Sequence, residues 1–175
     1  MMTAKADLLA SLRAGSSARE AALALLATDQ PRRSAITWLL AGTLAPGDAP
    51  IARALLAQET ADIQRSRAAS EALYTLVAIV ARYADPADVL LLWRAREANE
   101  ETREGVDIEQ VARLGLGAVR ATLARLAAGT DATASEARAA QAWLVEGQAA
   151  GAFDDLPGYF AWSDERFGLV ITAPT

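Results

Sequence analysis

Apolar residues recur every three or four positions along nearly the whole of this 175-residue chain. This spacing is that of one face of an α-helix, whereas a half-buried strand would repeat at every second position. Glycine or proline stands where successive helices should end, at Gly15, Pro31, Gly47, Gly105 and Gly129. The sequence therefore predicts an all-α protein whose helices are joined by short connections.

Short connections place sequence neighbours antiparallel, as in a helical bundle or a stack of helical hairpins. The helices are expected at residues 4–14, 17–28, 33–43, 49–60, 62–83, 86–104, 108–128, 134–150 and 156–165. Helix starts are marked by the capping boxes Ser17–Glu20 and Thr133–Glu136, and by the caps Asp85 and Asp107.

Length and composition predict one domain, residues 1–175, with residues 152–175 as a C-terminal cap or tail. With 53% hydrophobic but only 6% aromatic residues, the core must be built mainly from Ala, Leu and Val. The apolar stripes of the central helices predict the buried residues Leu73, Val77, Leu91, Leu92, Trp93, Leu114, Val119 and Leu123.

The stretch DPADVLLLWRAREA, residues 85–98, combines Asp and Pro in a turn with Val89 and, further along, Arg94 and Arg96. It resembles the start of the second helix of a HEAT-like or armadillo-like repeat, and the resemblance covers about residues 17–150. It implies a short α-solenoid, a superhelix of stacked antiparallel hairpins whose concave face binds a macromolecule. The possible repeats are unequally spaced, and an irregular helical bundle is the alternative fold.

The chain contains neither histidine nor cysteine. Serine–histidine triads, cysteine nucleophiles and sites built on histidine or thiolate ligands are therefore excluded. Carboxylate-bound magnesium or manganese, or metal-free chemistry of carboxylate, Tyr, Lys or Arg, remains. We assign no catalytic residue, expect no cofactor and no metal site, and regard an enzyme as the less favoured class.

One window carries the whole net charge. Residues 97–109 contain six acids and one base, whereas the rest of the chain has sixteen of each, and the protein has a net charge of −5. The apolar pattern of the helix ends before this window, so its acids are expected to be exposed. We predict an acidic projection, either merely solvated or binding a basic protein partner. Its members are Glu97, Glu100, Glu101, Glu104, Asp107 and Glu109.

The same acids allow a catalytic interpretation. Glu97 with Glu100, and Glu101 with Glu104, form E-x-x-E patterns, and the E-x-x-D pair of Glu59 with Asp62 would complete a magnesium site from a second helix. The set resembles that of all-α nucleotide pyrophosphohydrolases of the MazG type, although the two patterns occur here in reversed order. The resemblance implies a magnesium-dependent hydrolase of nucleotides or phosphorylated small molecules.

Other partner classes find little support. Basic residues are scattered, so no nucleic acid is expected. Gly115-Leu116-Gly117 lies inside a predicted helix, which argues against a phosphate loop. The longest strongly apolar run, Ala72–Ala81, is half a membrane span, and the N-terminus lacks the pattern of a secretion signal. These features, with one lysine beside sixteen arginines, indicate a cytoplasmic bacterial protein.

Five of the ten aromatic residues lie close together near the C-terminus: Phe153, Tyr159, Phe160, Trp162 and Phe167. They are expected either to cap the last helix pair, because an open stack must cover its ends, or to contact a partner. The sequence thus favours a non-enzymatic scaffold or adaptor that binds a protein, with the magnesium-dependent hydrolase as the alternative. It does not specify the partner or the oligomeric state.

Overall fold

The computed structural model describes residues 2–169 and confirms the all-α fold. This part of the chain has no strand and contains eleven α-helices and two 3₁₀ turns, η1 and η2. The helices are α1 (Met2–Arg13), α2 (Ser16–Ala27), α3 (Gln30–Ala41), α4 (Ala49–Ser66), α5 (Glu71–Arg82), α6 (Val89–Arg96), α7 (Glu100–Gly105), α8 (Glu109–Ala112), α9 (Leu116–Ala127), α10 (Ala132–Ala149) and α11 (Leu156–Arg166). The turns are η1 (Pro46–Asp48) and η2 (Pro86–Asp88).

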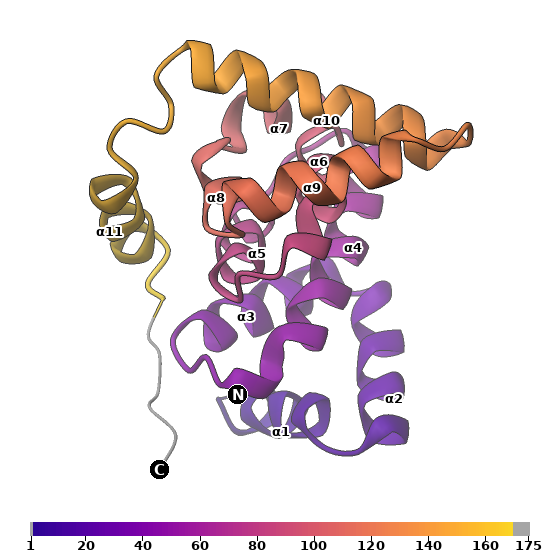
Figure 1. Cartoon of the computed structure of the whole chain (residues 1–175). Helices are drawn as coiled ribbons and strands as arrows, with labels where there is room; N and C mark the ends of the chain where they lie inside the picture. Colours follow the sequence, from indigo (N-terminus) through magenta and orange to yellow (C-terminus); the bar gives the residue numbers. More distant parts are fainter. Residues whose placement is uncertain (1, 170–175) are drawn as a thin grey trace.

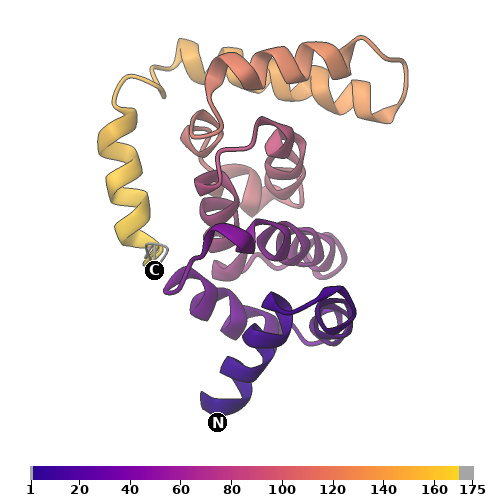
Figure 2. The ribbon, with the colours of Figure 1, turned by 60° about the horizontal axis from the view of Figure 1, so that its bottom comes forward.

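The helices stack in sequence order from α1 and α2 at one end to the α9–α10 pair at the other (Figure 1). α11 departs from this order and lies along one side of the stack (Figure 2). The arrangement is compatible with a helical repeat-like fold. Within residues 2–169, no helix combines the length and the apolar character needed to cross a membrane.

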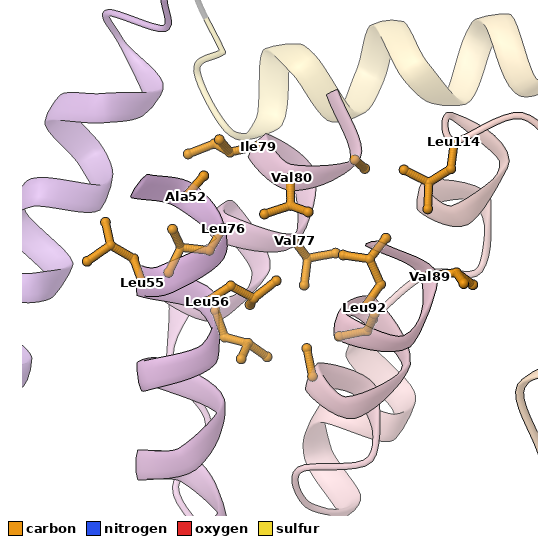
Figure 3. Close-up of a cluster of buried hydrophobic side chains, with 14 of the residues drawn as sticks. Ala52, Leu55, Leu56, Leu76, Val77, Ile79, Val80, Val89, Leu92 and Leu114 are labelled. Carbon is orange, nitrogen blue, oxygen red and sulfur yellow. The ribbon is translucent and has the colours of Figure 1, made fainter. Parts of the chain in front are cut away.

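α5 forms the centre of the core, because nine of its twelve residues are buried. Leu56 of α4, Val77 of α5 and Leu92 of α6 belong to one buried cluster (Figure 3). Burial on all sides agrees with the nearly unbroken apolar sequence of α5, since a helix that exposed one face would carry polar residues there.

Most of the predicted core is confirmed, with two exceptions. Leu73, Val77, Leu92, Leu114, Val119 and Leu123 are buried. Leu91 and Trp93 are only partly buried, because five successive residues of α6 turn through more than one full turn and cannot all face the core. Trp93 instead packs at the edge, with its ring 5.6 Å from that of Trp143.

Three predicted helix boundaries are wrong. A new helix was expected to begin at residue 62, but residues 62–66 belong to α4. The residue after α4, Arg67, has a left-handed conformation (φ 62°), and α5 begins after the cap Ser70. The helix expected over 86–104 stops at Arg96 and restarts as α7 after the cap Asn99. The helix expected over 108–128 is divided at Gly115, whose φ of +84° suits glycine and interrupts an α-helix.

The last division also changes the context of Gly115-Leu116-Gly117, which opens α9 instead of lying inside a helix. It follows the helix α8 and not a strand, so the strand–loop–helix context of a phosphate loop is absent here. Both predicted capping boxes are wrong as well. α2 begins after Gly15 without a side-chain cap, and Asp131, not Thr133, caps α10. Asp85 does cap its turn, accepting from the Ala87 backbone N–H.

Two bidentate ion pairs join an arginine to an aspartate at the same sequence spacing. Arg13 binds both carboxylate oxygens of Asp48 at 2.7 and 2.9 Å, and Arg53 binds both of Asp88 at 2.7 and 2.8 Å. Each aspartate ends a Pro-x-Asp 3₁₀ turn and lies 35 residues after its arginine. A third, more exposed pair joins Arg94 to Glu136 of α10. These bridges connect successive parts of the stack.

A buried charge network links α3 to α4. The Arg33 side chain is fully buried and donates to Glu59 at 2.6 Å and to the Leu26 carbonyl at 2.6 Å. It also binds Asp62, and the Ser70 hydroxyl donates to Glu59. The network therefore satisfies a charged group that would be very costly to bury alone.

Candidate functional site

The acidic projection centres on α7. A cap stabilises the start of this helix, and a hydrogen bond joins it to α4. Asn99 and Thr102 form a reciprocal cap, with each side chain accepting from the other residue's backbone N–H at 2.8 and 3.0 Å. The Asn99 amide also donates to the Arg67 carbonyl at 3.1 Å, at the end of α4. α7 is therefore held in a defined position against α4.

A groove of about 780 Å³ lies between these two elements. It is lined by Gln64, Arg67, Glu97, Ala98, Asn99, Glu100, Glu101, Arg103 and Glu104. Four of the six acids of the predicted projection thus share one groove. Gln64 and Arg67 were not predicted as part of the site, because no local sequence signal indicates that the end of α4 lies beside α7.

Glu100, Glu101 and Glu104 are exposed, and none forms an ion pair with another residue in the range 2–169. Glu100 and Glu104 are four residues apart on a helix and repel each other. Three uncompensated charges on six residues create a local negative potential along the groove. We call these three residues the free acids.

Glu97 behaves differently, because two arginines bind it. One carboxylate oxygen contacts Arg96 and the other accepts from Arg103 at 3.1 and 3.2 Å. The guanidinium of Arg96 lies 5.3 Å from the Trp93 ring and 5.0 Å from the Trp143 ring. The two rings are themselves 5.6 Å apart, so Arg96 lies beside both of them, and these contacts help to hold Arg96, and through it Glu97, at the wall of the groove.

Asp107 and Glu109 lie outside the groove and are partly buried. Asp107 accepts a hydrogen bond of 2.8 Å from the Tyr159 hydroxyl. Burial, and next the negative charge of Asp107, raise the pKa of Tyr159. Burial also raises the pKa of Glu109. The six predicted acids are therefore not one uniform exposed surface, and Asp107 does not cap α8 as its sequence position suggests.

The carboxylates of the magnesium hypothesis are not brought together. Glu59 and Asp62, the expected ligands from a second helix, both bind Arg33. Among the residues that the structure describes, no three acids come close enough to hold a metal ion.

The C-terminal aromatics lie on or beside α11, which packs on α8 and not over the α9–α10 pair (Figure 1). Trp162 is half exposed, while Phe153, Tyr159, Phe160 and Phe167 are partly buried. The Tyr159 ring lies 6.0 Å from that of Phe160 and 5.5 Å from that of Trp162. The expected cap over the last pair is therefore not the arrangement found, and residues 170–175 of the predicted tail lie outside the described range.

No protein-family model matches this chain, and neither a curated protein nor a solved structure matches it.

Proposed function

We propose that the protein is a non-enzymatic helical scaffold that binds a protein partner through the groove beside α7. The partner would present a basic segment. The observation that carries the proposal is the set of free acids, Glu100, Glu101 and Glu104, which are exposed beside a groove and lack arginine partners among the described residues.

Local stability accounts for only part of this accumulation of charge. Glu100 and Glu101 lie in the first turn of α7, where carboxylates are favoured, whereas Glu104 lies in its last turn, where they are not. Like charges spaced four apart disfavour a helix, and the arginines on the groove wall leave these three acids unpaired. A basic segment entering the groove would neutralise them, and complementary potentials would speed its association and fix its register. Arg67 and Arg103 would restrict where cationic side chains of the partner can lie, which favours a spaced pattern over a continuous basic run.

The architecture supports a scaffold. The repeated Arg–Asp bridges at η1 and η2, together with the stacked helices, resemble a HEAT-like or armadillo-like solenoid. Folds of that kind present extended surfaces to macromolecules while each unit contacts mainly its neighbours. A short rigid stack would therefore hold α7 at a fixed place for docking.

Fluorescence anisotropy with a labelled arginine- and lysine-containing peptide tests the proposal, with a glutamine-substituted peptide as the probe control. The variant E100Q/E101Q/E104Q should bind the basic peptide at least about tenfold more weakly, with the loss greatest at low salt. The matched variant E20Q/E146Q/E165Q removes the same charge from three exposed acids elsewhere and should bind nearly as well as the wild type. Equal losses in both variants would show attraction by net charge alone and reject the groove.

The alternative hydrolase makes a separate prediction for the same variants. A thermal shift with Mg²⁺ or Mn²⁺ and a nucleotide, accompanied by metal-dependent hydrolysis that E100Q/E101Q/E104Q abolishes, would favour the enzyme over the scaffold.

A further inference from the structure

α11 is connected to the rest of the molecule by a non-helical segment, residues 150–155. Gly151 within it adopts a φ of +76°, a backbone conformation that suits glycine. From there the chain leaves α10 and runs down one side of the stack (Figure 2). α11 is therefore an arm and not a further layer.

The arm buries little apolar surface. Within α11, Ser163 is the only residue that is buried, and Trp162 is 51% exposed. α5, in contrast, is buried over most of its length. Hydrophobic burial normally dominates the attachment of a helix, so the attachment of α11 depends unusually on polar contacts.

Those polar contacts form an organised set. The Asp164 carboxylate forms ion pairs with Arg113 at 2.8 Å and with Arg82 at 3.0 Å. Arg113 also donates to the Phe160 carbonyl at 2.7 Å, and its guanidinium lies 4.4 Å from the Phe160 ring.

Gln110 completes the receiving surface. Its amide donates to Ser163 at 2.7 Å and to the Tyr159 hydroxyl at 3.1 Å, while Tyr159 donates to Asp107. The side chains of Gln110 and Arg113 are almost fully buried, yet each finds its side-chain partners, among the described residues, in α11. The body of the protein thus presents a built polar site for one helix.

We propose that this site is a helix-binding site that α11 occupies reversibly in cis, and that α11 of a second copy can occupy it in trans. The site comprises Arg82, Asp107, Gln110 and Arg113. It recognises a helix with an aromatic pair followed, about one turn later, by Ser-Asp, the pattern of Tyr159-Phe160 and Ser163-Asp164.

The second copy is the occupant that the structure specifies, because α11 is the segment whose side chains fit the site. Exchange replaces every intramolecular contact with an identical intermolecular one, as in domain swapping. The tether favours the cis arrangement at low protein concentration, since it supplies an effective concentration of about a millimolar. Departure of the arm would expose Arg113 to water, while Arg82 is already partly exposed with the arm in place.

Anisotropy with a fluorescein-labelled peptide of residues 152–169 tests the proposal on the full chain. D164N weakens the cis arm by removing the carboxylate shared by Arg82 and Arg113, so this variant should bind the wild-type peptide about tenfold more tightly than the wild-type protein does. E165Q carries the same charge change at an exposed neighbour and should bind like the wild type. A peptide carrying D164N should bind more weakly to every protein. Equal binding of the wild-type peptide by D164N and E165Q would overturn the proposal.

Hydrogen exchange on the unmodified wild-type protein provides an independent reading. The α11 amides should exchange much faster than those of α5, and faster still at high salt, because salt screens the ion pairs that hold the arm. Sedimentation should show a dimer whose fraction increases with protein concentration. If the amides of α11 and α5 exchanged hydrogen at one common rate, the arm would not detach from the stack. If the protein remained a monomer at every concentration, the arm would not occupy the site of a second copy.

Discussion

Three buried carboxylates in the stack differ from the acids on α7, because an arginine binds each of them. Asp48, Glu59 and Asp88 are buried, and each binds an arginine from another helix. The free acids of α7 are exposed and have no such partner within residues 2–169. Within one chain, therefore, the same functional group either connects helices or remains available, and tertiary contact with an arginine decides which.

The largest loss of stability is expected at Arg33, which binds a buried carboxylate of the paired group. Arg33→Met should lower the free energy of unfolding by about 3–5 kcal/mol, because it leaves Glu59 buried without a counter-ion. Urea denaturation measures the loss. Arg32→Met, at an exposed neighbouring position, should cost less than about 1 kcal/mol, and the double variant R33M/E59M should recover much of the stability. A loss below about 1 kcal/mol for Arg33→Met would mean that the pair is not held in a buried site.

The repeated bridges should show graded effects. Asp88→Asn should cost about 1.5–3 kcal/mol, because a buried charged partner of Arg53 is lost, and Asp48→Asn should cost a similar amount opposite Arg13. Glu136→Gln, which removes the exposed bridge to Arg94, should cost less than about 1 kcal/mol. The midpoints of urea denaturation, compared at a constant m-value, rank the losses of stability of the three variants. If Glu136→Gln were as costly as Asp88→Asn, burial would not be the distinguishing factor.

Local sequence patterns were sufficient for part of this architecture. The spacing of apolar residues identifies the helices and most of the core, and Asp85 before Pro86 correctly marks a turn. Such signals depend on residues a few positions apart. The breaks at Arg67 and Asn99 escaped prediction. Arginine rarely adopts a positive φ, and the cap of α7 has Thr102 at the position where a capping box normally has glutamate or glutamine.

The ion pairs could not be derived from local spacing, since Arg33 and Glu59 lie 26 residues apart. A signal did exist for the other two bridges. Pro46-Gly47-Asp48 and Pro86-Ala87-Asp88 share a pattern, and each has an arginine 35 residues earlier. For the site, counting charges along the sequence identified residues 97–109 as an acidic window. It could not separate Glu97 and Asp107, which have partners, from the free acids, because those partners depend on how α7 and α11 pack.

Alkaline pH should weaken the paired region through Tyr83, whose hydroxyl donates to the Ala45 carbonyl beside Asp48. Burial, followed by the charge of Asp48, raises the pKa of Tyr83 from 10.0 to about 12. Between these pH values the unfolded chain loses this proton more readily than the folded one, so stability should fall as the pH rises.

Thermal melting against pH tests this for Tyr83→Phe. The variant should be less stable than the wild type below pH 10, where it lacks only a hydrogen bond, and should lose less additional stability above it. Parallel curves for the two proteins across this range would show that Tyr83 ionises normally and that the surroundings of Asp48 are open to water.

The smallest effect on stability is expected where the charges are unpaired. E100Q/E101Q/E104Q should change the free energy of unfolding by less than about 0.5 kcal/mol, or raise it slightly. It removes repulsion between Glu100 and Glu104, which opposes the loss of two carboxylates from the first turn of α7, and it breaks no ion pair among the described residues. Glu97→Gln, at an acid outside this set, should lower the free energy of unfolding by about 0.2–1 kcal/mol, because it removes the contacts with Arg96 and Arg103.

Chemical denaturation with urea, which adds no ions, should be repeated at low and high salt. Any gain in the triple variant should disappear at high salt, since screening removes the repulsion in the wild type. A large loss in the triple variant would mean that the free acids are structural, and the contrast with Asp48, Glu59 and Asp88 would then fail. An unchanged stability together with weakened binding of a basic peptide would instead assign these charges to recognition.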